Sequence, residues 1–66
     1  MGARLELLKF RKTQGLTQTQ FAKILGITAT HYSRIETGQS NPSFEIMEKL
    51  KINFKVEDVF GLFEKC

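Results

Sequence analysis

The chain has 66 residues, of which 41% are hydrophobic, 11% aromatic and 26% charged. This length provides one hydrophobic core and excludes multi-domain architectures and large enzymes, so we expect a single domain over residues 1–66. One histidine and one cysteine cannot form an intrachain disulfide or supply the four ligands of a structural zinc site. The sequence therefore predicts no metal and no cofactor, and Cys66 is expected to be an idle thiol. Stability must then come from self-association or from a well-packed helical core.

Positive charge is concentrated in the first part of the chain. Ten Lys and Arg against seven Asp and Glu give a net charge of +3. Residues 1–40 hold six basic and two acidic side chains, a balance of +4, whereas residues 41–66 hold four basic and five acidic ones, a balance of −1. The first segment suits a polyanionic partner, although ordinary solvated helix surfaces give the same pattern. No apolar run is long enough for a signal peptide or a membrane span, so we expect a cytoplasmic protein without membrane contact.

Strong helix formers predict the first two helices. Residues 4–14 are rich in Leu, Lys, Arg and Glu, and Gly15 then offers the left-handed residue that ends a helix. Thr17 and Gln20 have the spacing of a capping box, in which each side chain bonds the backbone amide of the other residue. The second helix is therefore expected over residues 17–25.

The next helix follows after a short turn. Gly26 closes the second helix, and Thr28 can cap a third one, which is expected over residues 28–37 with Gly38 as its stop. Tyr32 lies on the inner edge of this helix by its spacing from the other apolar residues. We expect its ring to pack inward and its hydroxyl to reach the edge of the domain.

Turn-forming residues around Pro42 separate the remaining two helices from the first three. Ser43 can cap a fourth helix, expected over residues 43–51. A last helix is expected over residues 56–63, without an evident N-terminal cap. No hairpin motif and no sustained alternation of apolar and polar residues occur, so the sequence predicts an all-α fold of five helices.

The two short helices around Gly26 have the lengths and the glycine-containing turn of a helix-turn-helix, whose second helix enters the major groove of DNA. Ala22 is small enough to let the two helices cross closely, and Gly26 permits the sharp turn. Tyr32 and Ile35 anchor the second helix to the body of the domain. The side chains then free to face a ligand are Ala29, Thr30, Ser33 and Arg34.

Three segments together form a specific sequence pattern. They are LTQTQFAKILGIT at residues 16–28, YSRIETG at residues 32–38 and the Asn-Pro-Ser turn at residues 41–43. With them, residues 5–60 resemble the Cro and phage-repressor (XRE-type) helix-turn-helix family. The resemblance implies a compact five-helix domain that binds operator DNA as a symmetric dimer and regulates transcription, and we expect a repressor.

The resemblance also implies which residues contact DNA. Gln18, at the start of the second helix, would bind a phosphate, a position that helix N-termini favour independently. Arg34 matches a base-facing position, where it would pair with guanine or, alternatively, clamp a phosphate. His31 is expected at the rim of the groove, or as an inert surface residue. The full set of expected DNA contacts is Gln18, Thr28, Ala29, Thr30, His31, Ser33, Arg34, Thr37, Gly38 and Gln39.

The C-terminal part departs from the family pattern. The segment between Leu50 and Phe54 is about two residues shorter than usual, so a truncated or tilted fourth helix is expected. Lys55 stands where a capping serine is frequent. The last helix nevertheless carries more apolar side chains than one buried face needs. They either close the core or form a dimer seam, with Leu62 and Phe63 as the main contacts. The expected seam consists of Phe54, Val56, Val59, Phe60, Leu62 and Phe63.

The sequence also indicates a buried ion pair and a second apolar surface. Arg11 and Glu36 match a pair that, in the resembling proteins, joins the first helix to the third by a largely buried salt bridge. A second apolar surface, an alternative to the dimer seam, is available at Leu5, Leu8, Ile24 and Ile46.

The sequence therefore predicts a sequence-specific regulator that binds double-stranded DNA as a homodimer, with helix 28–37 in the major groove of a pseudo-palindromic operator. The alternative is a protein-interaction module of the same fold, antitoxin-like or a bridging factor, with an unknown protein partner. An enzyme is not expected. His31 and Ser33 point apart on their helix, and no nucleophile with a base, paired carboxylates or metal cluster is evident.

Overall fold

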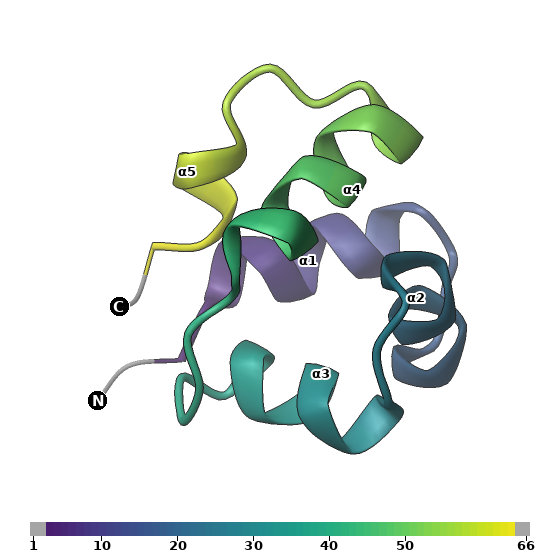
Figure 1. The fold of residues 1–66 in the computed structure, drawn as a ribbon, viewed down its shortest axis with the longest axis vertical. Coiled ribbons are helices and arrows are strands. Elements are labelled where there is room, and N and C mark those ends of the chain that lie inside the picture. Colours follow the sequence, from purple (N-terminus) through teal and green to yellow (C-terminus); the bar gives the residue numbers. More distant parts are fainter. Residues whose placement is uncertain (1–2, 65–66) are drawn as a thin grey trace.

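The structure, a computed structural model that describes residues 3–64, consists of five helices around one core (Figure 1). They are α1 (Leu5–Thr13), α2 (Gln18–Leu25), α3 (Ala29–Glu36), α4 (Phe44–Phe54) and α5 (Val59–Leu62). No strand occurs in this part of the chain. The predicted all-α fold is confirmed, while Cys66 lies outside the described residues.

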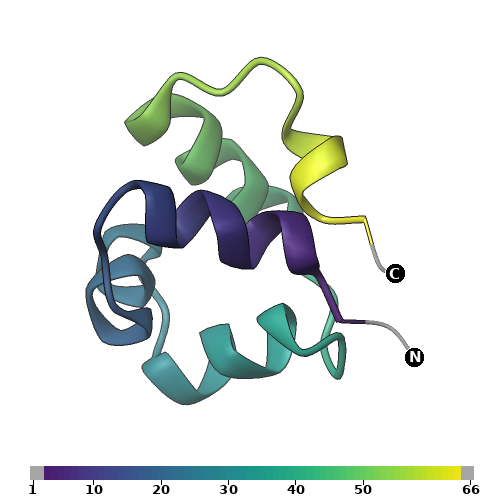
Figure 2. The same ribbon diagram turned by 180° about the vertical axis from the view of Figure 1, so that it is seen from behind.

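The first helix lies at the front of the molecule in Figure 2, with α4 above it and α3 below it in that view. The second helix packs against α3 and α4, and α5 packs against α1 and α4. In both ribbon views α3 lies along one side of the molecule, away from α4 and α5 (Figures 1 and 2). This arrangement leaves the outer face of α3 open.

The first three helices begin and end within one residue of the predicted bounds, because their terminal signals are local. The Thr17 hydroxyl accepts from the Gln20 amide at 3.2 Å, and the Thr17 amide donates to the Gln20 side chain at 2.9 Å. The predicted capping box is therefore present. The Thr28 hydroxyl likewise accepts from the His31 amide at 3.0 Å. Gly26 ends α2 in the left-handed conformation, with φ of 76°.

The fourth helix is longer than expected. It continues through Phe54, three residues past the predicted end at Lys51, so the expected truncation is wrong. The extra turn carries the Phe54 ring into the core. There it stacks on Phe21, with ring centroids 5.2 Å apart, and meets Phe10 edge-on at 5.5 Å. These aromatic contacts stabilise the last turn of α4. The helix then ends without a glycine, at Lys55, which adopts the left-handed conformation with φ of 54°.

The last helix is a single turn and much shorter than the predicted span of residues 56–63. Asp58 caps it, since its Oδ1 accepts from the Gly61 amide at 3.1 Å. A Cβ atom at Gly61 would lie only 2.8 Å from the same carboxylate, so the missing side chain allows the close approach. The N-terminal cap of α5, which was not evident from the sequence, is thus Asp58, and its partner is the Gly61 amide.

The core contains Ile46, which had been expected as a spare surface residue but is only 5% exposed. The core as a whole consists of apolar side chains from all five helices and from the residue after α5. The buried hydrophobic residues are Leu7, Phe21, Ala22, Leu25, Tyr32, Ile35, Ile46, Leu50, Val59 and Phe63.

Arg4 closes the fold between its first and last helices, a role that the sequence analysis missed. Its side chain is buried, and its Nε donates to the carbonyl of Phe63 at 2.8 Å. The guanidinium also donates to the carbonyls of Ile35 and Ser40 and to the Asn41 side chain. Burial lowers the pKa of Arg4 below its ordinary value. Although its charge belongs to the +4 balance of residues 1–40, this guanidinium faces inward and is unavailable to a polyanion.

Candidate nucleic-acid interface

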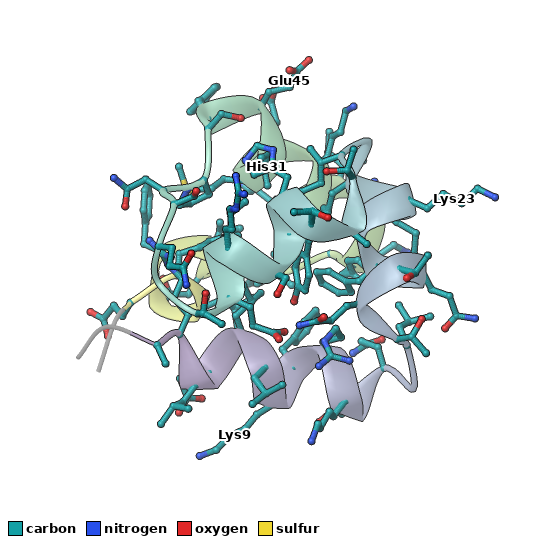
Figure 3. All side chains as sticks on the ribbon, turned by 90° about the horizontal axis from the view of Figure 1, so that it is seen from below. Lys9, Lys23, His31 and Glu45 are labelled. Carbon is teal, nitrogen blue, oxygen red and sulfur yellow. The ribbon has the colours of Figure 1, made fainter. Side chains whose placement is uncertain are left out.

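The outer face of α3 is the side of the molecule that Figure 3 presents to the reader. The second helix flanks α3, and the two helices are joined by the turn at Gly26 and Ile27. The turn is held by the Ile27 amide, which donates to the Ala22 carbonyl at 3.0 Å. With Ala22 and Gly26 in their expected roles, the structure has the helix-turn-helix arrangement.

Most of the predicted DNA contacts lie together on this face. Seven of the ten line one open depression between the N-terminus of α2, the outer face of α3 and the loop after α3. They combine two small side chains, several hydrogen-bonding groups and one cation. The seven residues are Gln18, Ala29, Thr30, Ser33, Arg34, Thr37 and Gln39.

The other three predicted contacts lie outside the depression. The Thr28 hydroxyl caps α3, and Gly38 ends the helical segment with φ of 89° while its amide donates to the Ile35 carbonyl. His31 is exposed on α3 (Figure 3) and does not line the depression. These three residues therefore shape or border the face.

Few cations lie on the face itself. Of the six basic residues before position 41, Arg4 is only 3% and Arg11 only 9% exposed. Lys9 pairs with Glu6 on α1 at 3.7 Å, and Lys23 extends from α2 to another side (Figure 3). Among the basic residues between positions 3 and 64, Arg34 alone lines the depression. The strongest electrostatic contact available to a polyanion in the depression is therefore Arg34.

A buried polar network lies directly beneath this face and is centred on Glu36. The predicted salt bridge is present: Arg11 Nε donates to Glu36 Oε2 at 2.9 Å, and both side chains are almost fully buried. Tyr32 donates its hydroxyl to the same oxygen at 2.7 Å, and Gln18 Nε2 donates to Oε1 at 2.7 Å. Arg11 also donates to the Leu16 carbonyl at 2.9 Å. The network joins α1, α2 and α3.

The network fixes the charges of its members. Burial raises the pKa of the Glu36 carboxyl, but the hydrogen bonds from Arg11, Tyr32 and Gln18 outweigh it, so this pKa lies below its ordinary value. The hydrogen bond to Glu36 raises the pKa of the Arg11 guanidinium. Burial and the adjacent carboxylate raise the pKa of the Tyr32 hydroxyl far above its usual range. At neutral pH Glu36 and Arg11 are both charged and Tyr32 is a neutral donor.

Two predictions need correction in this network. Tyr32 is completely buried, and its hydroxyl ends on Glu36 and does not reach the edge of the domain. The side chain of Gln18, expected to be free for a phosphate, uses one amide N–H for Glu36. A glutamine amide has two N–H groups, so Gln18 keeps a second donor. Gln18 and Glu36 lie on different helices, so the sequence did not indicate their contact. Tyr32 and Glu36 are four residues apart on α3, and this contact was missed because the hydroxyl was expected at the edge of the domain.

The expected dimer seam is mostly buried within the chain itself. Val59 and Phe63 are 6% and 8% exposed and belong to the core, while Phe54, Val56 and Leu62 pack partly against it. Phe63 was expected to be a main partner contact, and the structure corrects this because its ring is needed to close the small core. Among the six residues only Phe60 is largely exposed, at 73%.

Phe60 belongs to a second, apolar depression, between α4 and α5. The other apolar residues that line it are Phe44, which is 74% exposed, Met47 and Val59. The remaining lining residues are the charged side chains Glu48, Lys51 and Glu57. This depression is far less polar than the face of α3.

The described residues contain no grouping of three or more His, Cys, Asp or Glu side chains that could bind a metal ion. Nor is any helix within residues 3–64 both long enough and apolar enough to cross a membrane.

Comparison with known proteins identifies the arrangement. A family model described as helix-turn-helix matches residues 7–59. Antitoxin PezA of Streptococcus pneumoniae serotype 4 is 42% identical over 53 residues, which cover 77% of this chain and 34% of that relative. The chain thus spans about a third of the length of this curated relative. No solved structure matches the chain. Because the match of residues 7–59 includes α2, the turn and α3, the chain belongs to the helix-turn-helix family.

Proposed function

We propose that this chain is a sequence-specific DNA-binding regulator, acting as a repressor, with the outer face of α3 in the major groove. The observation that carries the proposal is the depression lined by Gln18, Arg34 and five further residues of α3 and its following loop. These side chains suit base edges: Arg34 can donate two parallel bonds to guanine, and Ala29 and Thr30 offer methyl groups to thymine. No catalytic role is proposed.

Phosphate contacts would flank the base contacts. Gln18 is the first residue of α2, where the partial positive charge of the helix N-terminus favours a phosphate. Thr37 and Gln39, which follow α3, line the same depression. Phosphate contacts from α2 and from this loop would fix the register of α3 in the groove without reading sequence themselves.

The proposal is tested by selecting bound duplexes from a random DNA pool with the wild-type chain. We expect a pseudo-palindromic consensus with half-sites about one helical turn apart. On the selected duplex, Arg34→Ala should reduce affinity about tenfold or more, because a bidentate base contact is lost. Lys9→Ala is the matched control: it removes the same charge from α1, away from the depression, and should change affinity much less.

Selection without enrichment of any sequence, or equal losses in the two variants, would contradict sequence-specific reading through α3. The salt dependence of binding provides a further check, since each phosphate contact contributes to its slope.

We propose that a second copy of the chain covers the apolar depression between α4 and α5, giving a homodimer. Phe44 and Phe60 are largely exposed there, and Glu48, Lys51 and Glu57 supply charges of both signs at its edge. An interface on a two-fold axis must be complementary to itself, which paired aromatic rings and mixed charges can satisfy. Sedimentation equilibrium would show a dimer, whereas a monomer at high concentration would exclude it.

A second candidate function is binding to a protein, as in an antitoxin-like regulator. The similarity to a protein named as an antitoxin favours it. The two candidates separate in one experiment: tight binding to a protein partner, with no affinity for DNA at low salt, would favour the second and contradict the first.

A further inference from the structure

The two carboxylate oxygens of Glu36 accept hydrogen bonds from different donors. Tyr32 and Arg11 Nε both donate to Oε2, at 2.7 and 2.9 Å. Gln18 donates to Oε1 at 2.7 Å, whereas Arg11 Nη2 is 3.5 Å from the same oxygen. The contact between Arg11 and Glu36 is therefore strong on one side only, and Gln18 is the main donor to the other oxygen.

We propose that Tyr32 is a positioning residue for DNA binding: its hydroxyl orients Glu36, and Glu36 orients the Gln18 amide at the DNA-facing depression. This inference rests on the proposed function and assigns to the buried residues Tyr32 and Glu36 a part in it. Tyr32 does not contact the depression, because its side chain is completely buried.

The hydroxyl prevents a competing geometry. An arginine and a carboxylate prefer two parallel hydrogen bonds of similar length. Without the Tyr32 hydroxyl, Oε2 keeps a single donor, and the carboxylate can rotate so that Arg11 Nη2 approaches Oε1. That rotation draws Oε1 away from Gln18. Tyr32 thus maintains the one-sided arrangement in which Oε1 remains available to Gln18.

Glu36 in turn determines which end of the Gln18 amide faces inward. A carboxylate only accepts hydrogen bonds, so the NH2 group of Gln18 must point towards it. The amide then has a defined direction and a second N–H available for a phosphate oxygen. A Gln18 side chain released from Glu36 would have to be ordered when DNA binds, at a cost in side-chain entropy.

The inference is tested by a double-mutant cycle on the duplex of about 20 base pairs obtained by selection, long enough for two half-sites. Tyr32→Phe removes only the hydroxyl, and we expect it to lower affinity about fivefold, the effect of one hydrogen bond. Gln18→Ala should lower affinity at least as much. The double variant should bind as Gln18→Ala does, because Tyr32 acts through Gln18.

Thr19→Ala is the matched control for Gln18→Ala, since Thr19 is the next residue of α2 and is exposed. Its effect should add to that of Tyr32→Phe. Additive losses for Tyr32→Phe and Gln18→Ala would overturn the inference and leave the proposed function intact. Failure of the wild-type chain to bind any duplex would overturn both.

A second readout requires no DNA. In the free wild-type chain, the side-chain NH2 protons of Gln18 should have the downfield NMR shift of a bond to a carboxylate. Tyr32→Phe should move these signals towards those of a solvated glutamine. Unchanged Gln18 signals in a folded Tyr32→Phe variant would overturn the inference. Tyr32→Met provides a second hydroxyl-free variant if Tyr32→Phe does not fold.

Discussion

The α2–α3 region and the α4–α5 region differ in how their helix ends are formed and in what they expose. Both α2 and α3 begin at threonine caps, and Gly26 ends α2 in a left-handed conformation that glycine adopts without strain. The fourth helix instead ends on Lys55 in the same conformation, which disfavours a residue with a Cβ. The outer face of α3 is polar, whereas Phe44 and Phe60 are exposed beside α4 and α5.

This difference indicates that the two regions suit different partners. The proposed DNA face requires its polar groups in a fixed register, which local caps and the Glu36 network provide. An exposed apolar depression suits a protein surface and gains free energy by excluding water. Substitutions in the two regions should therefore affect different properties, and the following predictions test that separation.

The largest effect is expected in the network beneath α3. Glu36→Ala leaves the buried Arg11 without its counter-ion, so we expect the free energy of unfolding to fall by about 3–5 kcal/mol. Urea denaturation followed by circular dichroism measures the loss. Glu48→Ala, which removes an exposed carboxylate from α4, should stay within about 0.5 kcal/mol of the wild type. Similar losses in the two variants would remove the proposed distinction between the regions.

Acid should weaken the same network to a smaller extent, because a protonated Glu36 still fills its place. Its pKa in the folded chain lies below the ordinary value of 4.5. The carboxylate therefore contributes stability at pH values above 4.5, and this contribution is lost as the pH falls through the lowered folded-state pKa. Melting temperatures measured from neutral to acidic pH should fall more in the wild type than in Glu36→Gln. Parallel curves would contradict the assignment.

In the α4–α5 region the expected effect is on association. Phe60→Ser should raise the dissociation constant of the proposed dimer about tenfold or more, as for a central aromatic contact. Its effect on the stability of the monomer should be small, because the ring is 73% exposed. Phe63→Ser, at a ring only 8% exposed, should instead destabilise the fold. Analytical ultracentrifugation and thermal melts separate the two outcomes.

The smallest effect concerns the end of α4. Lys55→Gly should stabilise the chain by about 0.5–1 kcal/mol, since relief of the left-handed strain exceeds the added entropy of the unfolded chain. Gly15→Ala is the reverse control: Gly15 has φ of 74° and open space around an added Cβ, so this variant should lose about 1 kcal/mol for the same reason. If Lys55→Gly instead destabilises the chain in urea denaturation, the end of α4 is not strained and this contrast with α2 fails.

The same contrast explains which elements could be predicted. The first three helices are specified by caps and glycines within a few residues of their ends, so pattern analysis placed them correctly. The end of α4 depends on Phe54 meeting Phe21, more than thirty positions earlier in the chain. No local pattern records such a contact. Asp58 was missed as a cap because the hydrogen bond that its carboxylate accepts from the Gly61 amide requires the short helix to exist first.

The candidate site shows the same division. Its outer residues could be predicted because family resemblance places Ala29, Thr30 and Arg34 at fixed positions along one helix. The support beneath them could be predicted only in part: the pair of Arg11 and Glu36 was expected, while the bonds of Gln18 and Tyr32 to Glu36 were not. Each oxygen of Glu36 has more than one nearby donor, and only the three-dimensional arrangement decides which donors it takes.

The contact between Arg4 and the Phe63 carbonyl bears on how the chain folds during synthesis. The two residues are 59 positions apart, so Arg4 is made long before the carbonyl to which it donates. Until that carbonyl is available, placing the guanidinium in its final position would bury a charged group with an incomplete set of acceptors. We therefore expect the nascent chain to delay docking of α1 until α5 has left the ribosome, so that the domain forms in one late, cooperative step.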